Sequence, residues 1–194
     1  MKFVCLLLTL LSSFSTLSIT VNPVNQVTQA QFIQVNGANL KARLDAAANQ
    51  ARANNQIKRY WTAYQFDVRP GVAVDVEWRN EKGVYIQDGV MMGNGKVETR
   101  NLGVFILREV GIDAISRIEI YNLDRRREYS GYPVYWTGRA NNEESLNWLK
   151  SIADGETTRK LVEQAVTAMA LHDDARVSAM LEDFVRQSKV ESVR

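Results

Sequence analysis

The chain has 194 residues, of which 45% are hydrophobic and 24% charged, an ordinary composition for a soluble globular protein. Its 11 glycines, 3 prolines and single cysteine exclude collagen, a disordered tail and a disulfide scaffold. The net charge of +2 is too small for a dedicated nucleic-acid binder, which gathers basic charge on one face, so we expect no nucleic-acid partner.

The N-terminus has the layout of a secretory signal peptide. A positively charged start is followed by the uncharged, mostly apolar residues 3–11 and then by the Ser/Thr-rich residues 12–20. The apolar run is shorter than the about 20 residues that span a bilayer. We therefore expect an exported protein, periplasmic or extracellular, with no stable membrane insertion once residues 1–20 are removed. Candidate cleavage positions follow Ser15, Ser18 and Ala30.

Residues 21–57 are expected to form a polar segment and then an alanine-rich helix. Residues 21–37 are rich in Gln, Asn and Val and predict no regular structure. A helix is predicted over residues 39–57, with Asn39 as its N-cap. Because its apolar stripe is thin, we expect the helix to dock weakly or to act as a spacer. The stripe consists of Leu40, Leu44, Ala47, Ala48 and Ala51.

Residues 58–138 have the pattern of a β-rich domain. In residues 72–78 apolar side chains alternate with mostly charged ones, which predicts a strand with one buried face. Short turns such as Asn94-Gly95 separate the predicted strands, which favours a small, mostly antiparallel sheet. The strands are predicted over residues 60–68, 72–78, 84–86, 102–107 and 115–122, and the aromatic segment 132–136 leads to a break at Gly138.

From Asn142 onward the apolar residues recur at helical spacing. Asn142 is the predicted N-cap of the first of three helices, with breaks at Asp154-Gly155 and at residues 172–174. The three apolar stripes begin at Leu146, Leu161 and Val177. The chain is therefore predicted to be α+β, with a small sheet domain followed by antiparallel helix pairs.

The helical part repeats itself. Residues 156–159 (Glu-Thr-Thr-Arg) recur as residues 191–194 (Glu-Ser-Val-Arg), and at the same offset Leu146 matches Leu181 and Leu149 matches Phe184. On these residues the segment 142–194 resembles the HEAT-repeat family. The resemblance implies antiparallel helix pairs stacked into an α-solenoid, with Asp154 and Arg159 at the family's loop Asp and second-helix Arg. An unrelated helical bundle is the alternative.

The repeat would be incomplete at its C-terminal end. Arg194 falls where the second helix of a repeat should begin, which leaves the stripe of residues 177–185 half covered. Solenoids need about three repeats to bury their cores. We therefore expect the sequence to be part of a longer repeat protein.

Few residues suggest catalysis or metal binding. His172 is the single histidine of the chain, so no second histidine can complete a metal site with it. We therefore expect no metal and no cofactor. We place it in a loop between helices, with Asp174 capping the next helix. Asp75 and Glu77 share one strand face and form a possible acid/base pair, although a solvated outer face also explains them. No residue is assigned as catalytic.

Two groups of residues point to binding. Arg125, Arg126 and Arg127 form either a clasp for phosphate or an acidic polymer, or a charged surface turn. The aromatic residues form either a buried seam between sheet and helices, which we favour, or an exposed stacking platform, with Tyr64 or Tyr132 at the rim. They are Tyr60, Trp61, Tyr64 and Phe66, and Tyr129, Tyr132, Tyr135 and Trp136.

The sequence predicts an exported, non-enzymatic protein-interaction or scaffold module. Stacked helices present a large surface that typically binds other proteins, so another protein is the expected partner. The alternative is a cell-envelope hydrolase or glycan-binding protein with its site on the β-rich domain. The candidate interaction residues are Arg125, Arg126, Arg127, Arg159, Arg176, Arg186, Tyr64 and Tyr132, and the alternative acid/base pair is Asp75 and Glu77.

Overall fold

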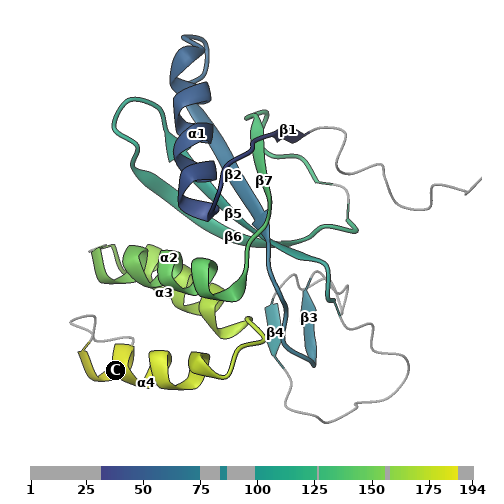
Figure 1. The fold of residues 1–194 in the computed structure, drawn as a ribbon, viewed down its shortest axis with the longest axis vertical. Helices are drawn as coiled ribbons and strands as arrows, with labels where there is room; N and C mark the ends of the chain where they lie inside the picture. The colour runs from purple at the N-terminus through teal and green to yellow at the C-terminus, as the bar shows by residue number, and fades with distance from the viewer. Residues whose placement is uncertain (1–31, 75–83, 87–98, 126, 156–157, 188–194) are drawn as a thin grey trace, which may run out of the picture.

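The computed structural model describes residues 32–74, 84–86, 99–125, 127–155 and 158–187. This part of the chain forms a five-stranded sheet, a separate two-stranded sheet and four helices (Figure 1). The fold is therefore α+β, as the sequence predicted. None of the helices in these ranges has the length and hydrophobicity needed to cross a membrane.

The main sheet is mixed, with strand order β1-β7-β2-β5-β6. β2 pairs antiparallel with β5 and β5 with β6, as expected, but β7 lies parallel between β1 and β2. The parallel pairings arise because the connection between β6 and β7 crosses the sheet before β7 begins. The bounds are β1 Phe32–Gln34, β2 Arg59–Gln65, β5 Leu102–Glu109, β6 Ile115–Asn122 and β7 Val134–Arg139, and the small sheet pairs β3 Val72–Val74 with β4 Val84–Ile86.

The prediction of no regular structure over residues 21–37 is wrong at Phe32–Gln34, which form β1; residues 21–31 lie outside the described ranges. The side chain of Phe32 accounts for the strand. Its ring stacks on Trp136 at 5.4 Å and meets the Tyr129 ring edge-on at 5.6 Å. A distant aromatic cluster therefore holds a segment whose local composition favours no strand.

Helix α1 (Leu40–Ala53) is capped by Asn39 as predicted, because the Asn39 side chain accepts a hydrogen bond from the Ala42 N–H at 2.8 Å. The expectation of weak docking is wrong. Small alanine side chains let the helix approach the sheet closely, where Tyr60 and Tyr135 fill the space beneath it. All five residues of its thin apolar stripe are at most 1% exposed.

The other helices are α2 (Asn142–Gly155), α3 (Arg159–Ala170) and α4 (Arg176–Gln187). Asn142 is not the N-cap of α2, because the Asn141 side chain accepts the Glu144 N–H at 2.8 Å. Asn142 instead accepts from the Asp67 N–H and donates to the Asp173 carbonyl, which ties the segment after β2 to the loop before α4.

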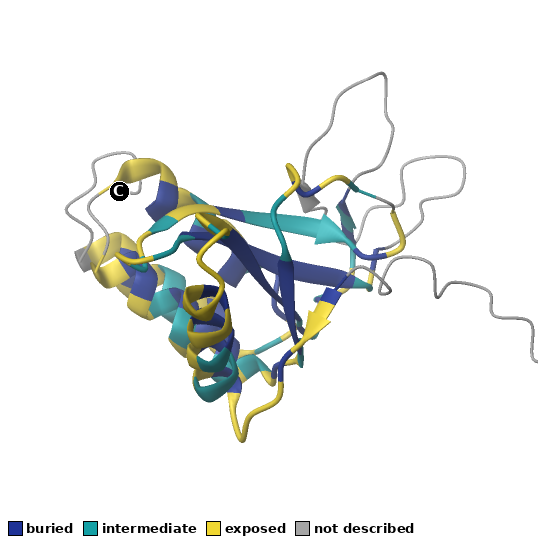
Figure 2. Cartoon of the chain, turned by 90° about the horizontal axis from the view of Figure 1, so that it is seen from above, coloured by how far each residue is buried: buried dark blue, intermediate teal, exposed yellow. Residues whose placement is uncertain are grey.

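The two faces of the main sheet are covered differently (Figure 2). Tyr64, Phe66, Ile106 and Ile118 face α2 and α3 and share one apolar cluster with them. On the opposite face, Trp61, Phe105 and Trp136 pack with Leu123 and Tyr129 of the connection between β6 and β7. Because strand side chains alternate between faces, the predicted aromatic seam holds for Tyr64 and Phe66 but not for Trp61 and Trp136.

Candidate functional site

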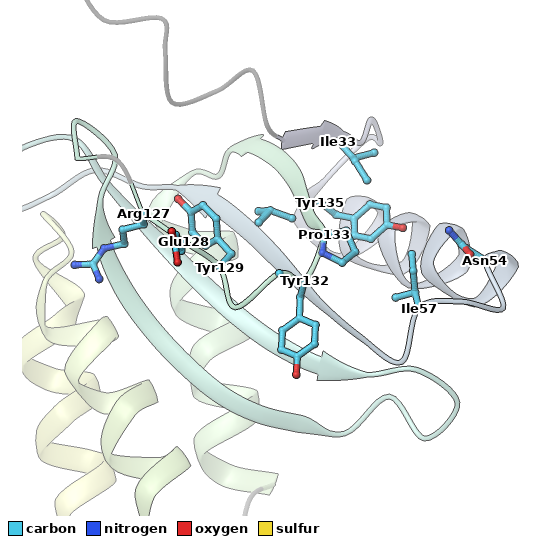
Figure 3. A pocket seen from close by; sticks show the side chains of 11 residues that line it. Ile33, Asn54, Ile57, Arg127, Glu128, Tyr129, Tyr132, Pro133 and Tyr135 are labelled. Carbon is cyan, nitrogen blue, oxygen red and sulfur yellow. The ribbon is translucent and has the colours of Figure 1, made fainter.

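A cavity of about 990 Å³ opens at the end of the sheet where β1 and β7 begin (Figure 3). It is formed by β1, the residues after α1 and the segment that leads into β7. The lining is rich in tyrosine and combines apolar, amide and charged groups. The lining residues are Ile33, Asn54, Ile57, Arg127, Glu128, Tyr129, Gly131, Tyr132, Pro133, Val134 and Tyr135.

A tight turn places the first two tyrosines. The Tyr132 N–H donates to the Tyr129 carbonyl at 3.1 Å, and Ser130 and Gly131 between them have φ values of 55° and 73°. Two central residues with positive φ define a type I′ turn, for which Gly pays no steric cost. The indole N–H of Trp61 also donates to the Tyr129 carbonyl, at 3.1 Å. The turn is thus fixed to the sheet, with Tyr129 buried and Tyr132 partly exposed.

Strand pairing places the other wall of the cavity. Ile33 of β1 lies beside Tyr135 of β7 in register, and the Tyr135 ring meets Tyr60 edge-on at 5.7 Å. Beyond the end of α1, the Ile57 N–H donates to the Asn54 carbonyl at 3.0 Å, and both residues line the cavity. Residues from three separate segments therefore meet at one place.

The cavity is largely neutral at physiological pH. Burial raises the pKa of Tyr129 to about 12 and also raises the pKa of Tyr135, so both hydroxyls stay protonated. Hydrogen bonds from Arg59 to Tyr132 and to Glu109 raise the pKa of the Arg59 guanidinium. Formal charge on the lining comes from Arg127 and Glu128, at one end of the cavity in Figure 3.

The structure brings two of the predicted interaction residues into the cavity, Arg127 and Tyr132. The Arg127 guanidinium lies over the Tyr121 ring, 4.1 Å from its centroid. Arg125 is exposed on the preceding turn, and Arg126 lies outside the described residues. Tyr64 is 0% exposed, so it cannot line a binding surface, because strand alternation points it into the core beneath the helices.

The three helical arginines are exposed but do not form one surface. Arg159 pairs with Glu163, Arg176 with Asp174, and Arg186 with Glu182. Arg159 begins α3 and Arg176 begins α4, so the length of α3 separates them. A smaller groove of about 440 Å³ on α4 is lined by Ser178, Leu181, Glu182, Val185 and Arg186. The alternative acid/base pair, Asp75 and Glu77, lies outside the described residues.

A serine–histidine pair lies inside the protein. The Ser145 hydroxyl is 2.7 Å from His172 Nε2, His172 Nδ1 is 2.9 Å from the Ala168 carbonyl, and the Tyr64 hydroxyl is 3.0 Å from Ser145. Because a carbonyl only accepts, Nδ1 carries the imidazole proton and Nε2 accepts from Ser145. Ser145 is 0% and His172 2% exposed, so this nucleophile-and-base geometry has no access to a substrate.

His172 occupies the loop between α3 and α4, as predicted, and Asp174 caps α4 by accepting the Arg176 N–H at 2.9 Å. The imidazole stacks on Phe66 with ring centroids 4.2 Å apart. Burial lowers the pKa of His172 to about 4, so the ring is neutral at physiological pH. Over the described ranges, no three His, Cys, Asp or Glu side chains gather as a metal site would require.

Sequence reasoning missed Ile33, Asn54, Ile57 and Glu128 as site residues. The Ser130-Gly131 dipeptide is the signal that predicts the turn and the exposure of Tyr132. No local signal marks Ile33 or Asn54, because strand pairing and helix docking bring them to the cavity. Comparison with protein-family models, with curated proteins and with solved structures found no match to this chain.

Proposed function

We propose that the chain is an exported, non-enzymatic interaction module that binds a segment of another protein in the tyrosine-lined cavity. Export is supported by the signal-peptide layout of residues 1–20. The binding site is supported by one observation above all, the open cavity in which Tyr129, Tyr132 and Tyr135 meet Ile33 and Ile57.

The composition of the cavity suits a polypeptide. Tyrosine offers a large apolar ring, a hydrogen-bonding hydroxyl and little side-chain entropy to lose, and it is enriched where proteins bind other proteins. Ile33, Ile57 and Pro133 supply apolar contact, while Asn54 and Glu128 supply hydrogen-bonding groups. A peptide also combines apolar side chains with a polar backbone. Its side chains can contact the apolar groups of the lining, and its backbone can hydrogen-bond to the polar ones.

The cavity is a better candidate than the helical arginines. Each of Arg159, Arg176 and Arg186 is at least 51% exposed and already has an acidic partner. Exposed ion pairs of this kind contribute little to binding because water and salt screen them. By contrast, the backbone beneath Tyr132 is held by a tight turn and by the Trp61 hydrogen bond, so little order has to be acquired on binding.

The proposal is tested by selecting a displayed library of random short peptides on the purified protein. A recovered peptide is then titrated against wild type and Tyr132→Ala, with the control Val185→Ala in the α4 groove. We expect Tyr132→Ala to weaken binding by about tenfold or more, and Val185→Ala to leave it unchanged. Circular dichroism checks that both variants fold.

Each other result points elsewhere. Binding lost in Val185→Ala but kept in Tyr132→Ala would place the interaction on the helical surface and overturn the cavity as the site. A glycan array run in parallel tests the alternative, a glycan-binding protein. If glycans bind through Tyr132 and no peptide does, or if neither binds, the proposal is wrong.

A further inference from the structure

The strand beside the cavity lies at the free end of the main sheet. Among the strands that the structure describes, β1 is the terminal one of this sheet and pairs with β7 alone (Figure 1). Such an edge carries peptide N–H and C=O groups that point away from the sheet. Natural edges are often short or charged to prevent pairing; β1 is short, with three residues, but it carries no charge and ends in the exposed pair Ile33 and Gln34.

The register shows which peptide groups point outward. The Val35 N–H donates to the Trp136 carbonyl at 2.9 Å, and Ile33 lies opposite Tyr135. Because successive residues of a strand turn their backbone groups to opposite sides, those of Ile33 and Val35 face β7. The N–H and C=O of Gln34 therefore point away from β7.

The outward edge is continuous with the cavity. Ile33 is 42% exposed and lines the cavity, while Phe32 on the opposite face anchors β1 in the aromatic cluster. Any chain laid along β1 would carry every second side chain on the same side as Ile33. Those side chains would lie toward Tyr135, Ile57 and Asn54.

We propose that the partner segment is an extended strand that adds to the free edge of β1 and places its alternate apolar side chains in the tyrosine-lined cavity. This inference rests on the proposed function and names the conformation of the ligand. The outward peptide groups of β1 are complementary in spacing and polarity to another extended polypeptide, which a helix or a sugar does not match. The backbone pairing supplies affinity, and the cavity selects the side chains.

Gln34 separates edge pairing from cavity binding. In Gln34→Pro the strand loses an N–H that points away from β7, and the proline ring occupies the edge that a partner strand would approach. The hydrogen bonds of Ile33 and Val35 to β7 remain. Gln34→Thr is the matched control, because it keeps the N–H and has high strand propensity.

The test titrates the peptide recovered from the displayed library against wild type, Gln34→Pro, Gln34→Thr and Tyr132→Ala. We expect Gln34→Pro to bind about tenfold more weakly or worse, and Gln34→Thr to bind within about twofold of wild type. Equal binding by Gln34→Pro and wild type, with loss in Tyr132→Ala, would overturn strand addition and leave the cavity proposal standing. Loss in neither variant, or no recovered peptide, would overturn both.

Amide hydrogen exchange of the unmodified protein gives a second measurement if Gln34→Pro does not fold. Strand addition is expected to slow exchange of the Gln34 N–H at least tenfold in the peptide complex, because that N–H becomes hydrogen-bonded. The Val35 N–H already pairs with Trp136 and serves as the internal reference. An unchanged Gln34 exchange rate in a saturated complex would overturn the proposal.

Discussion

The two faces of the main sheet are buried by different means. Three helices cover one face, where aliphatic side chains from α2 and α3 meet Tyr64, Phe66 and Ile106. The opposite face is covered by a connection without regular structure, and its interior is a cluster of aromatic rings. Large rings reach across a wide space, so an irregular segment can close a core that short aliphatic side chains would leave open.

The comparison also shows why the cavity lies where it does. A helix packs against the sheet along its whole length. A crossing segment covers the sheet only at the positions where its own side chains insert. Between Tyr129 and the start of β7, the tight turn places Tyr132 at the cavity, within reach of Arg59 at the start of β2. The candidate site therefore lies at the end of the sheet, between the crossing segment and the residues that follow α1.

The largest expected effect tests whether the aromatic face is a true core. Phe105 is 0% exposed and contacts the rings of Phe32, Trp61, Tyr121 and Tyr129. Phe105→Ala should lower the free energy of unfolding by about 3–5 kcal/mol, measured by denaturant titration. Leu149→Ala on the helix-covered face is the reference, at about 2–5 kcal/mol. A loss below about 1 kcal/mol for Phe105→Ala would show that the aromatic face is loosely packed.

The helix-covered face should be sensitive to acid. Burial lowers the pKa of His172 from 6.5 to about 4, so the unfolded chain binds this proton more readily than the folded one. Its contribution to stability is complete above pH 6.5 and is lost as the pH falls toward 4, by about 3 kcal/mol. Asp174 opposes the effect, since its negative charge favours the imidazolium.

His172→Gln isolates this titration, because it removes the ionising group while other carboxylates still titrate. The denaturation midpoint of wild type should fall more steeply between pH 6.5 and 4 than that of the variant. Parallel pH profiles for the two proteins would contradict the assignment of the acid sensitivity to His172.

A smaller effect tests the close docking of α1. Ala47 is 0% exposed over the sheet, so Ala47→Leu should overpack the contact and cost about 1–3 kcal/mol in thermal or denaturant unfolding. Ala53→Leu, at the exposed end of the same helix, is the matched control and should change stability by less than about 0.5 kcal/mol. Equal losses of stability in the two variants would mean that α1 is not closely packed against the sheet.

The smallest effect concerns the rim of the aromatic face. Arg127 lies over the Tyr121 ring, so Arg127→Gln should lower stability by about 0.5–1 kcal/mol through loss of the cation–π contact. Arg125→Gln on the neighbouring exposed turn should have no measurable effect in the same denaturant titration. If Arg125→Gln lowered stability more than Arg127→Gln, the Arg127 contact would not contribute to stability.

Local sequence determined the elements whose signals are short in range. The alternation over residues 115–122 predicts β6 with its observed bounds, Asn39 caps α1, and Asp174 caps α4. These features depend on hydrogen bonds and side-chain periodicity within a few residues, so they can be deduced without knowing the fold.

Tertiary structure decided the rest. β1 forms because Phe32 meets Trp136 and Tyr129, and the parallel pairing of β7 depends on a connection that crosses the sheet. Tyr64 and Ser145, 81 residues apart, share a buried hydrogen bond that no spacing rule predicts. The cavity likewise joins segments that are distant in sequence. The burial of large apolar side chains stabilises contacts between distant residues as strongly as contacts between neighbours.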